Sequence, residues 1–298
     1  MIRESLSLSS QVKVYHPLQV FTQAETFSLT HLIGNYWSVS IDKLIMKGII
    51  LILLLVLLGC GKETGKSSLS TQNVSPIYSS SELKIKVYYE EDAEPYTDQL
   101  TSVNKSLWDI FEVNLNTLFT GRPTSIQVPK TLDQMVKLKA YDKATWSVDE
   151  VLKMAKDYPV SEQKGVTQFQ IFFVKGNASE NPAIIGFHIS NTQIMVIFKD
   201  VVKSTAIGNA EIVSKYVEQA TLVHEMGHAL GLVNNGLPMQ SPHNDSKHHA
   251  HCSNENCVMY YANEGSASLM KYIQKILLEN RLVMFDQHCV NDAVNFKK

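Results

Sequence analysis

The stretch 211–231 constrains this chain most, because its residue pattern specifies one long helix with a defined end. Residues 211–223 contain no glycine or proline, and apolar residues recur at the three- and four-residue spacing of one helix face. These apolar positions are Ile212, Val213, Tyr216, Val217, Ala220 and Val223. Gly231 then stands where a helix commonly ends in a left-handed turn. The pattern predicts a helix whose last two turns carry His224 and His228.

The sequence HEMGH at the end of this helix places two imidazoles and one carboxylate together. Side chains four residues apart project from the same helix face, so His224 and His228 can direct ring nitrogens at one zinc ion about 2 Å away. Glu225 then lies beside the ion without binding it, where a carboxylate can act as general base and acid. The simpler alternative is an amphipathic helix whose two histidines are hydrogen-bonded and partly buried.

The surrounding residues resemble the metzincins, a family of zinc peptidases whose zinc-binding helix reads HExxHxxG and whose third ligand follows three residues later. Here that position is Asn234, and a neutral amide is a poor zinc ligand. The string HCSNENCVM at 251–259 resembles the archaemetzincin form of the signature, HC-x4-CxM, in which the histidine is the third ligand. The resemblance therefore implies His251 as third ligand, after an insertion of residues 234–250. His243, inside that insertion, is the alternative.

Two more residues gain a role from this resemblance. Met259 corresponds to the methionine of the turn beneath the metal, where it forms an apolar, polarisable floor. Tyr261 is similar to a metal-proximal tyrosine of some metzincins, whose phenol can donate a hydrogen bond to an oxyanion. Packing in the C-terminal part of the chain is the alternative for Tyr261.

The late cysteines leave two interpretations open. Archaemetzincins have a second, structural zinc on the HC-x4-C cysteines plus a later CxxC, whereas the late segment here reads DQHC. A second zinc would therefore use Cys252, Cys257, Cys289 and either Asp286 or His288, since zinc accepts mixed ligands. The other interpretation is a disulfide between two of the three cysteines.

The N-terminal part of the chain predicts export. Residues 46–59 have a basic start, an apolar stretch and a small residue before Cys60, as a lipoprotein signal peptide has. Their end, LLGC, resembles the bacterial lipobox, which implies acylation of Cys60 and an extracytoplasmic protein anchored by lipid to the outer membrane or cell surface. Residues 1–45 are then an over-extended start or a disordered extension. Residues 60–82 are expected to be a flexible tether.

Residues 83–298 are long enough to form one domain with one core, divided into subdomains at 83–232 and 233–298. The residue patterns predict strands at 83–89, 125–128, 169–174, 183–189 and 193–198, and helices at 106–119, 146–158 and 266–279. The resemblance implies an α+β fold. It consists of a mixed twisted sheet backed by helices, the long zinc-binding helix, and a smaller, mostly helical or irregular C-terminal subdomain.

The charge of the chain bears on its possible partners. A formal net charge of −2 without a basic stripe argues against a nucleic-acid-binding protein. The resemblance implies that an edge strand within 183–198 pairs with a peptide or protein substrate. We expect a monomeric zinc-dependent endopeptidase or aminopeptidase-like hydrolase with one catalytic Zn²⁺. The alternatives are a non-catalytic zinc-containing surface lipoprotein, acting in binding or adhesion, and a zinc-scavenging lipoprotein.

Overall fold

The computed structural model describes residues 72–297 apart from 101–104, 208–210 and 280. The predicted signal peptide and the acylated Cys60 lie outside the described residues. No helix in the described part of the chain has the length and apolar character of a membrane span.

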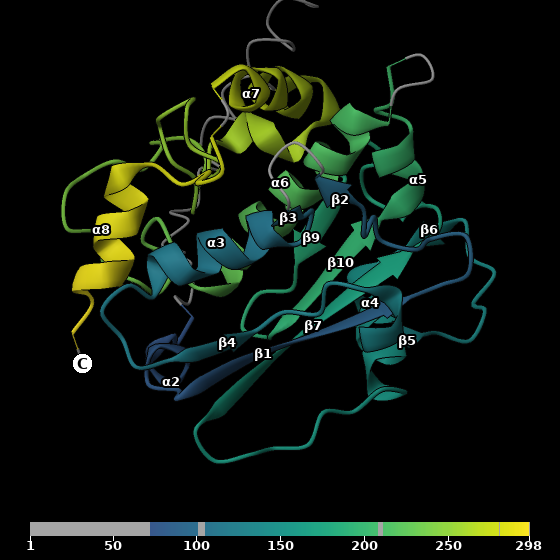
Figure 1. Cartoon of the computed structure of the whole chain (residues 1–298), viewed down its shortest axis with the longest axis horizontal. Helices are drawn as coiled ribbons and strands as arrows, with labels where there is room; N and C mark the ends of the chain where they lie inside the picture. Colours follow the sequence, from purple (N-terminus) through teal and green to yellow (C-terminus); the bar gives the residue numbers. More distant parts are fainter. Residues whose placement is uncertain (1–71, 101–104, 208–210, 280, 298) are drawn as a thin grey trace, which may run out of the picture. The chain divides into compact units, whose positions relative to one another are not determined.

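The fold is built on a mostly parallel sheet (Figure 1). In the described residues this sheet has six strands, in the order β4-β1-β7-β10-β9, with β5 also paired to β1. Only β9 runs antiparallel to its neighbour, so the sheet is mixed as predicted. The strands are β1 (Glu82–Tyr89), β4 (Ser125–Gln127), β5 (Val136–Lys137), β7 (Val166–Val174), β9 (Gly186–His188) and β10 (Ile194–Phe198). Two small ladders pair β2 (Gln99–Leu100) with β3 (Lys105–Ser106), and β6 (Thr145–Trp146) with β8 (Asn177–Ala178).

Helices cover both faces of the sheet, and the alternation of side chains along the strands explains why. Phe173 and Ile197 point into the core shared with α3, α6 and α7, whereas Phe172 and Phe198 point into a second core with α4. Because both faces are covered, the end of β7 (residues 171–174) and all of β10 are apolar. The helices are α2 (Ser75–Tyr78), α3 (Asp109–Leu118), α4 (Val148–Lys156), α5 (Lys199–Lys203), α6 (Ile212–Ala229), α7 (Ser266–Glu279) and α8 (Gln287–Asn295), with short 3₁₀ turns η1 (Leu132–Gln134) and η2 (Tyr261–Glu264).

Helix α6 is the predicted long helix, and it lies against β9 and β10 in the interior. A fully buried ion pair between Lys199 and Glu218 fixes its middle turn. The backbone N–H of Tyr96 donates to the same Glu218 carboxylate at 2.8 Å, and the Lys199 ammonium lies 3.2 Å from the centre of the Tyr96 ring. Each buried charge is thus compensated, as burial requires. These contacts hold the helix in one orientation about its axis. That orientation sets the direction in which the side chains of its last two turns project.

The predicted tether ends earlier than expected, which corrects the boundary at 82. Val74, Ile77 and Tyr78 are buried in the core, although the polar composition around them is typical of a linker. Moreover, the side-chain amide of Gln72 donates to the carbonyl of His228, at the end of α6. The folded domain therefore includes residues 72–82, because apolar side chains scattered in a polar segment are enough to dock it.

Most of the other predicted elements are found, although their ends are shifted by a few residues. The helix at 266–279 has the predicted bounds, whereas the strand predicted at 183–189 is confined to Gly186–His188. Helices α5 and α8 were not predicted from the sequence. Helix α8 begins where Asp286 accepts a hydrogen bond from the backbone N–H of Cys289 at 2.9 Å.

Truncation of Ile77 to alanine tests whether residues 72–82 belong to the domain. Ile77 is 3% exposed, so we expect Ile77→Ala to lower the free energy of unfolding by about 2–5 kcal/mol. Leu278, which is 88% exposed, gives the matched control, and Leu278→Ala should change it by less than about 0.5 kcal/mol. Urea denaturation measures both. Equal effects of the two variants would mean that this segment is a tether after all.

Candidate metal centre

The end of α6 brings His224 and His228 together as the helix period predicts. Their Nε2 atoms lie 3.0 Å apart. The Nδ1 atom of His224 lies 2.7 Å from the carbonyl oxygen of Val258, an acceptor, so Nδ1 carries the proton and Nε2 keeps its lone pair. Burial lowers the pKa of His224 to about 4 and that of His228 well below its usual value, and neighbouring histidines add to both effects. Both rings are therefore neutral, which is the form that binds metals.

His251, which follows the insertion in the sequence, lies next to these two rings. Its ring centre lies 4.8 Å from that of His228 and 5.4 Å from that of His224. The Nδ1 atom of His251 lies 2.8 Å from the carbonyl oxygen of His249, which directs Nε2 toward the other two histidines. That Nε2 atom is buried and has no hydrogen-bond partner among the described residues. A buried nitrogen of this kind calls for a ligand.

A carboxylate that sequence reasoning missed completes the group. One ligand atom each of His224, His228, His251 and Glu264 lie within 4.8 Å of one another. Glu264 is the last residue of η2, and its Oε1 atom lies 3.0 Å from Nε2 of His251 without the geometry of a hydrogen bond. The HExxH motif gives no signal for this residue, because its position depends on the turn that follows Met259.

The donor set fits zinc. Zinc binds histidine nitrogen at about 2.0–2.1 Å, so ligand atoms around a tetrahedral ion lie about 3.3 Å apart. The 3.0 Å between the Nε2 atoms of His224 and His228 needs only a small opening to match. Three imidazoles and a carboxylate are ordinary zinc ligands. This group of three histidines and one glutamate therefore suits one zinc ion.

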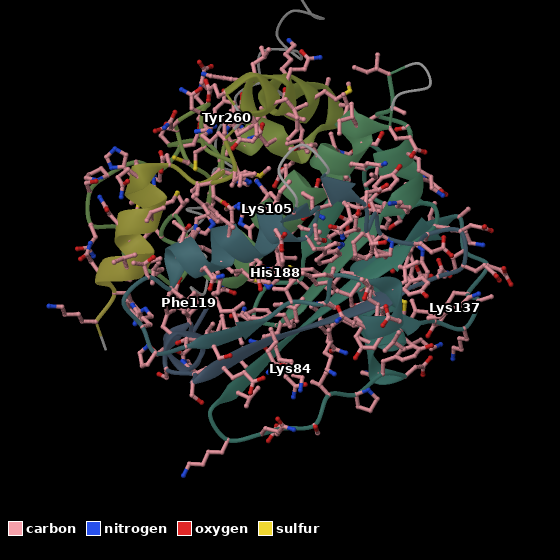
Figure 2. All side chains as sticks on the ribbon, in the orientation of Figure 1. Lys84, Lys105, Phe119, Lys137, His188 and Tyr260 are labelled. Atoms are coloured by element: carbon pink, nitrogen blue, oxygen red, sulfur yellow. The ribbon has the colours of Figure 1, made fainter. Side chains whose placement is uncertain are left out.

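Glu225 lies beside this group and outside it. The backbone N–H of His188 on β9, labelled in Figure 2, donates to Oε2 of Glu225 at 2.8 Å. This bond holds the carboxylate away from the histidine nitrogens and leaves Oε1 available for proton transfer. Burial raises the pKa of Glu225 well above its usual value, and the charge of Glu264 adds to the rise, against the His188 hydrogen bond. A carboxyl with a raised pKa suits proton transfer near neutral pH.

Met259 packs closely against α6, and its role as a floor beneath a metal stays a prediction. It is fully buried, and its sulfur lies directly beneath Gly227 on α6. A Cβ atom on Gly227 would collide with that sulfur. The glycine inside the HEMGH motif therefore allows α6 to contact the methionine turn closely.

The side chain of Tyr261 packs beside the cleft and does not line it. Its ring stacks on His248, with 3.7 Å between the ring centres, and it is not among the residues that line the cleft at the histidines. The oxyanion role stays a prediction. Glu264, from the same 3₁₀ turn, lines the cleft in its place.

The cleft is small, and the edge of the sheet borders it. It has a volume of about 230 Å³ and lies between β9 and the end of the insertion. Its lining residues include Ile184, Gly186, Phe187, His188, Ser190, Glu225, His228, Asn235, His249, Ala250, His251 and Glu264. Strand β9 ends the sheet order, so in the described residues no further strand pairs with its outer side. An extended segment can add to such an edge.

A second group of metal-binding side chains gathers around the cysteines. Ligand atoms of His243, Cys252, Asp286 and Cys289 lie within 4.8 Å of one another. Cys257 is not in this group, but its sulfur lies 3.6 Å from that of Cys289. All three cysteines are free thiols in the structure.

The structure therefore places His243 with the cysteines, and not with His224 and His228. Its Nδ1 atom lies 3.4 Å from the sulfur of Cys252, and its Nε2 atom lies 2.7 Å from Oδ2 of Asp292. Burial lowers the pKa of His243, but the bonds to Asp292 and Cys252 outweigh burial and raise the pKa to about 10. His288 stacks on the far side of His243.

Comparisons with known proteins find similar chains among the solved structures. No protein-family model matches the sequence, and no curated protein does. An archaemetzincin from Methanopyrus kandleri is similar over 72% of this chain and 94% of its own, with 15% identity and a TM-score of 0.43. A zinc-dependent peptidase from Methanocorpusculum labreanum is similar over 70% of this chain and 99% of its own, with 12% identity and a TM-score of 0.42.

The contact between Gly227 and Met259 gives a test of the site's packing. We expect Gly227→Ala to lower the free energy of unfolding by about 1–3 kcal/mol, because the new methyl group collides with the methionine sulfur. Zinc affinity should fall as well, since α6 carries two of the histidines. Gly265 has a φ of −99° and only ordinary contacts at 3.8 Å, so Gly265→Ala is the control and should not destabilise the protein. Thermal unfolding with and without zinc measures both, and an undisturbed Gly227→Ala variant would contradict the close contact.

Proposed function

We propose that this protein is a zinc-dependent hydrolase that cleaves peptide bonds. In this proposal His224, His228 and His251 hold the ion, and Glu225 is the general base and acid. The observation that carries it is the convergence of three imidazoles, two buried and one partly buried, beside a separately held carboxylate. They lie in a cleft bordered by β9, whose outer side pairs with no further strand in the described residues. Three protein ligands are the usual number in catalytic zinc sites.

Glu225 performs the proton transfers. A bound zinc ion supplies a Lewis acid that lowers the pKa of a water to about 7. Oε1 of Glu225 accepts the proton from the attacking water and later delivers it to the leaving amine. The hydrogen bond from the backbone of His188 keeps the carboxylate in one orientation throughout.

The same His188 backbone links proton transfer to substrate position. Strand β9 offers backbone groups on its outer side, and these can bind an extended peptide as an additional strand. Because the N–H of His188 holds Glu225, the strand that receives the peptide also orients the base. The substrate class that suits this edge is therefore an extended peptide or an unfolded protein segment.

Replacement of Glu225 by glutamine tests the proposal. We expect Glu225→Gln to reduce the hydrolysis of a mixed peptide library by about 10²–10⁴-fold, because the amide cannot accept the proton. Zinc content should stay the same, since Glu225 lies outside the ligand group. Glu162, an exposed glutamate, provides the control Glu162→Gln, which should keep full activity. Mass spectrometry of the peptides measures the rates.

Other outcomes of this experiment favour other functions. Activity that survives in Glu225→Gln contradicts the peptidase proposal. Firmly bound zinc without hydrolysis of any peptide would support a non-catalytic binding or adhesion module. Zinc that exchanges readily and serves no reaction would support scavenging.

We further propose a second, structural zinc held by Cys252, Cys257, Cys289 and His243. The sequence suggested Asp286 or His288 as fourth ligand. His288 stacks on His243 and is not in the ligand group, and both oxygens of Asp286 already accept hydrogen bonds. Its Oδ1 accepts from the backbone N–H of Cys289 and its Oδ2 from Asn254, each at 2.9 Å. This leaves the imidazole as the better fourth ligand.

The surroundings of His243 support this assignment. Asp292 lies against its Nε2 atom, and a carboxylate behind a zinc-binding histidine is the common arrangement that orients the ring. Zinc binding at Nδ1 would displace the proton between that nitrogen and the sulfur of Cys252, whereas Nε2 would keep the proton that it donates to Asp292. A site of three cysteines and one histidine is a usual structural zinc site.

Zinc stoichiometry distinguishes the second zinc from a disulfide. We expect about two zinc ions per chain in the intact protein and about one in His243→Ala, together with a lower unfolding temperature, because a structural zinc contributes to folding. His249→Ala, in the same loop, is the control and should keep both ions. Elemental analysis by mass spectrometry gives the counts. A disulfide between two of the three cysteines in the unreduced protein would contradict the second zinc.

A further inference from the structure

Glu264 has no part in the function proposed above, yet it is the carboxylate nearest to the three histidines. Its Oε1 atom lies 3.0 Å from Nε2 of His251, and its side chain is half-exposed in the cleft. It therefore both contacts a histidine nitrogen of the group and lines the cleft.

The contact between Glu264 and His251 is not an ordinary hydrogen bond. Nε2 of His251 is buried, and despite the nearby oxygen it has no hydrogen-bond partner among the described residues. These two residues and the two histidines of α6 each have a ligand atom within 4.8 Å of the others, which is close enough to surround one ion. An unpaired nitrogen and a carboxylate oxygen that share one target are expected of two ligands of the same cation.

Charge balance favours the same interpretation. Imidazole ligands bring no negative charge, so three of them leave the double charge of a zinc ion uncompensated in a partly buried site. Glu225 is held away by the backbone of His188, so Glu264 is the carboxylate that remains able to bind. Its half-exposed side chain can also turn outward into water, which a buried ligand cannot do.

The backbone of Glu264 is fixed even though its side chain is not. The neighbouring Asn263 is buried, and its amide donates to the carbonyls of Cys257 and Val258, each at 3.1 Å. Val258 O also accepts from His224. Release of the carboxylate therefore needs only side-chain rotation, and the histidines stay in place.

We propose that Glu264 is a fourth protein ligand of the catalytic zinc, so that the site rests in a latent state until a substrate displaces this carboxylate. The inference rests on the zinc site proposed above. In the exchange, the bond from Oε1 of Glu264 to the ion breaks and a water or substrate oxygen takes its place. No electron is transferred.

Variants of Glu264 in the full chain separate a ligand from a nearby charge. Glu264→Ala should weaken zinc binding by at least about tenfold and strengthen the binding of acetohydroxamate, which competes for the same position, by at least about tenfold. Glu264→Asp keeps the charge but is one methylene too short to reach the ion, so it should behave like Glu264→Ala. Exposed Glu255 gives the control, and Glu255→Asp should match the wild type in both affinities. Zinc is measured by competition with a fluorescent chelator, and acetohydroxamate through the absorption spectrum of the cobalt-loaded protein.

The results overturn the inference if Glu264→Asp matches the wild type, because charge alone then explains the effect. Unchanged zinc and acetohydroxamate affinities in Glu264→Ala overturn it as well. In both cases the peptidase proposal stands if hydrolysis still depends on Glu225. A protein that binds no zinc through His224, His228 and His251 would contradict both proposals.

Discussion

The carbonyl oxygen of Val258 connects the parts of the site. It accepts a hydrogen bond from Nδ1 of His224 at 2.7 Å and another from the amide of Asn263 at 3.1 Å. A carbonyl oxygen has two lone pairs, so both bonds form at once. The first bond fixes the tautomer of a metal-facing histidine, and the second fixes the turn that carries Glu264. Because Val258 itself is fully buried and its N–H donates to the carbonyl of Met284, this oxygen cannot move without disturbing the core.

The same turn connects the two candidate metal sites. Cys257 precedes Val258 and contacts the cysteine group, while Met259 follows it and lies under α6. On the other side of the cluster, His251 and Cys252 are neighbours in the chain but face different groups. A metal at the cysteine group would therefore stabilise the backbone from which both His251 and the methionine floor are presented. The proposed structural zinc would thus influence the geometry of the proposed catalytic site.

The sequence predicts what depends on local pattern and misses what depends on long-range folding. Helical spacing places His224 and His228 on one face of α6, and strand alternation identifies the central strands. Glu264 and His243 carry no such signal, because their positions depend on how a turn and a polar loop fold over the core. The segment at 72–82 was misjudged for a related reason, since a few buried side chains outweigh a linker-like composition. Assignment of His251 needed the family resemblance, and the structure places its ring with the other two.

The loop of residues 234–250 brings His251 to the two histidines of α6. After Gly231, the backbone takes left-handed φ values of 54° at Val233 and 59° at Asn234, which turn the chain sharply at the start of this loop. A left-handed backbone conformation is unusual for a β-branched residue. The packing of the buried Val233 side chain therefore has to hold the backbone in this conformation. The loop then returns on itself, because the backbone N–H of Asp245 donates to the carbonyl of His251 at 2.7 Å. The length of the loop adds little entropic cost, since the cost of closing a loop grows only slowly with its length. The insertion thereby delivers His251 to the end of α6, and its middle supplies His243 to the cysteine group.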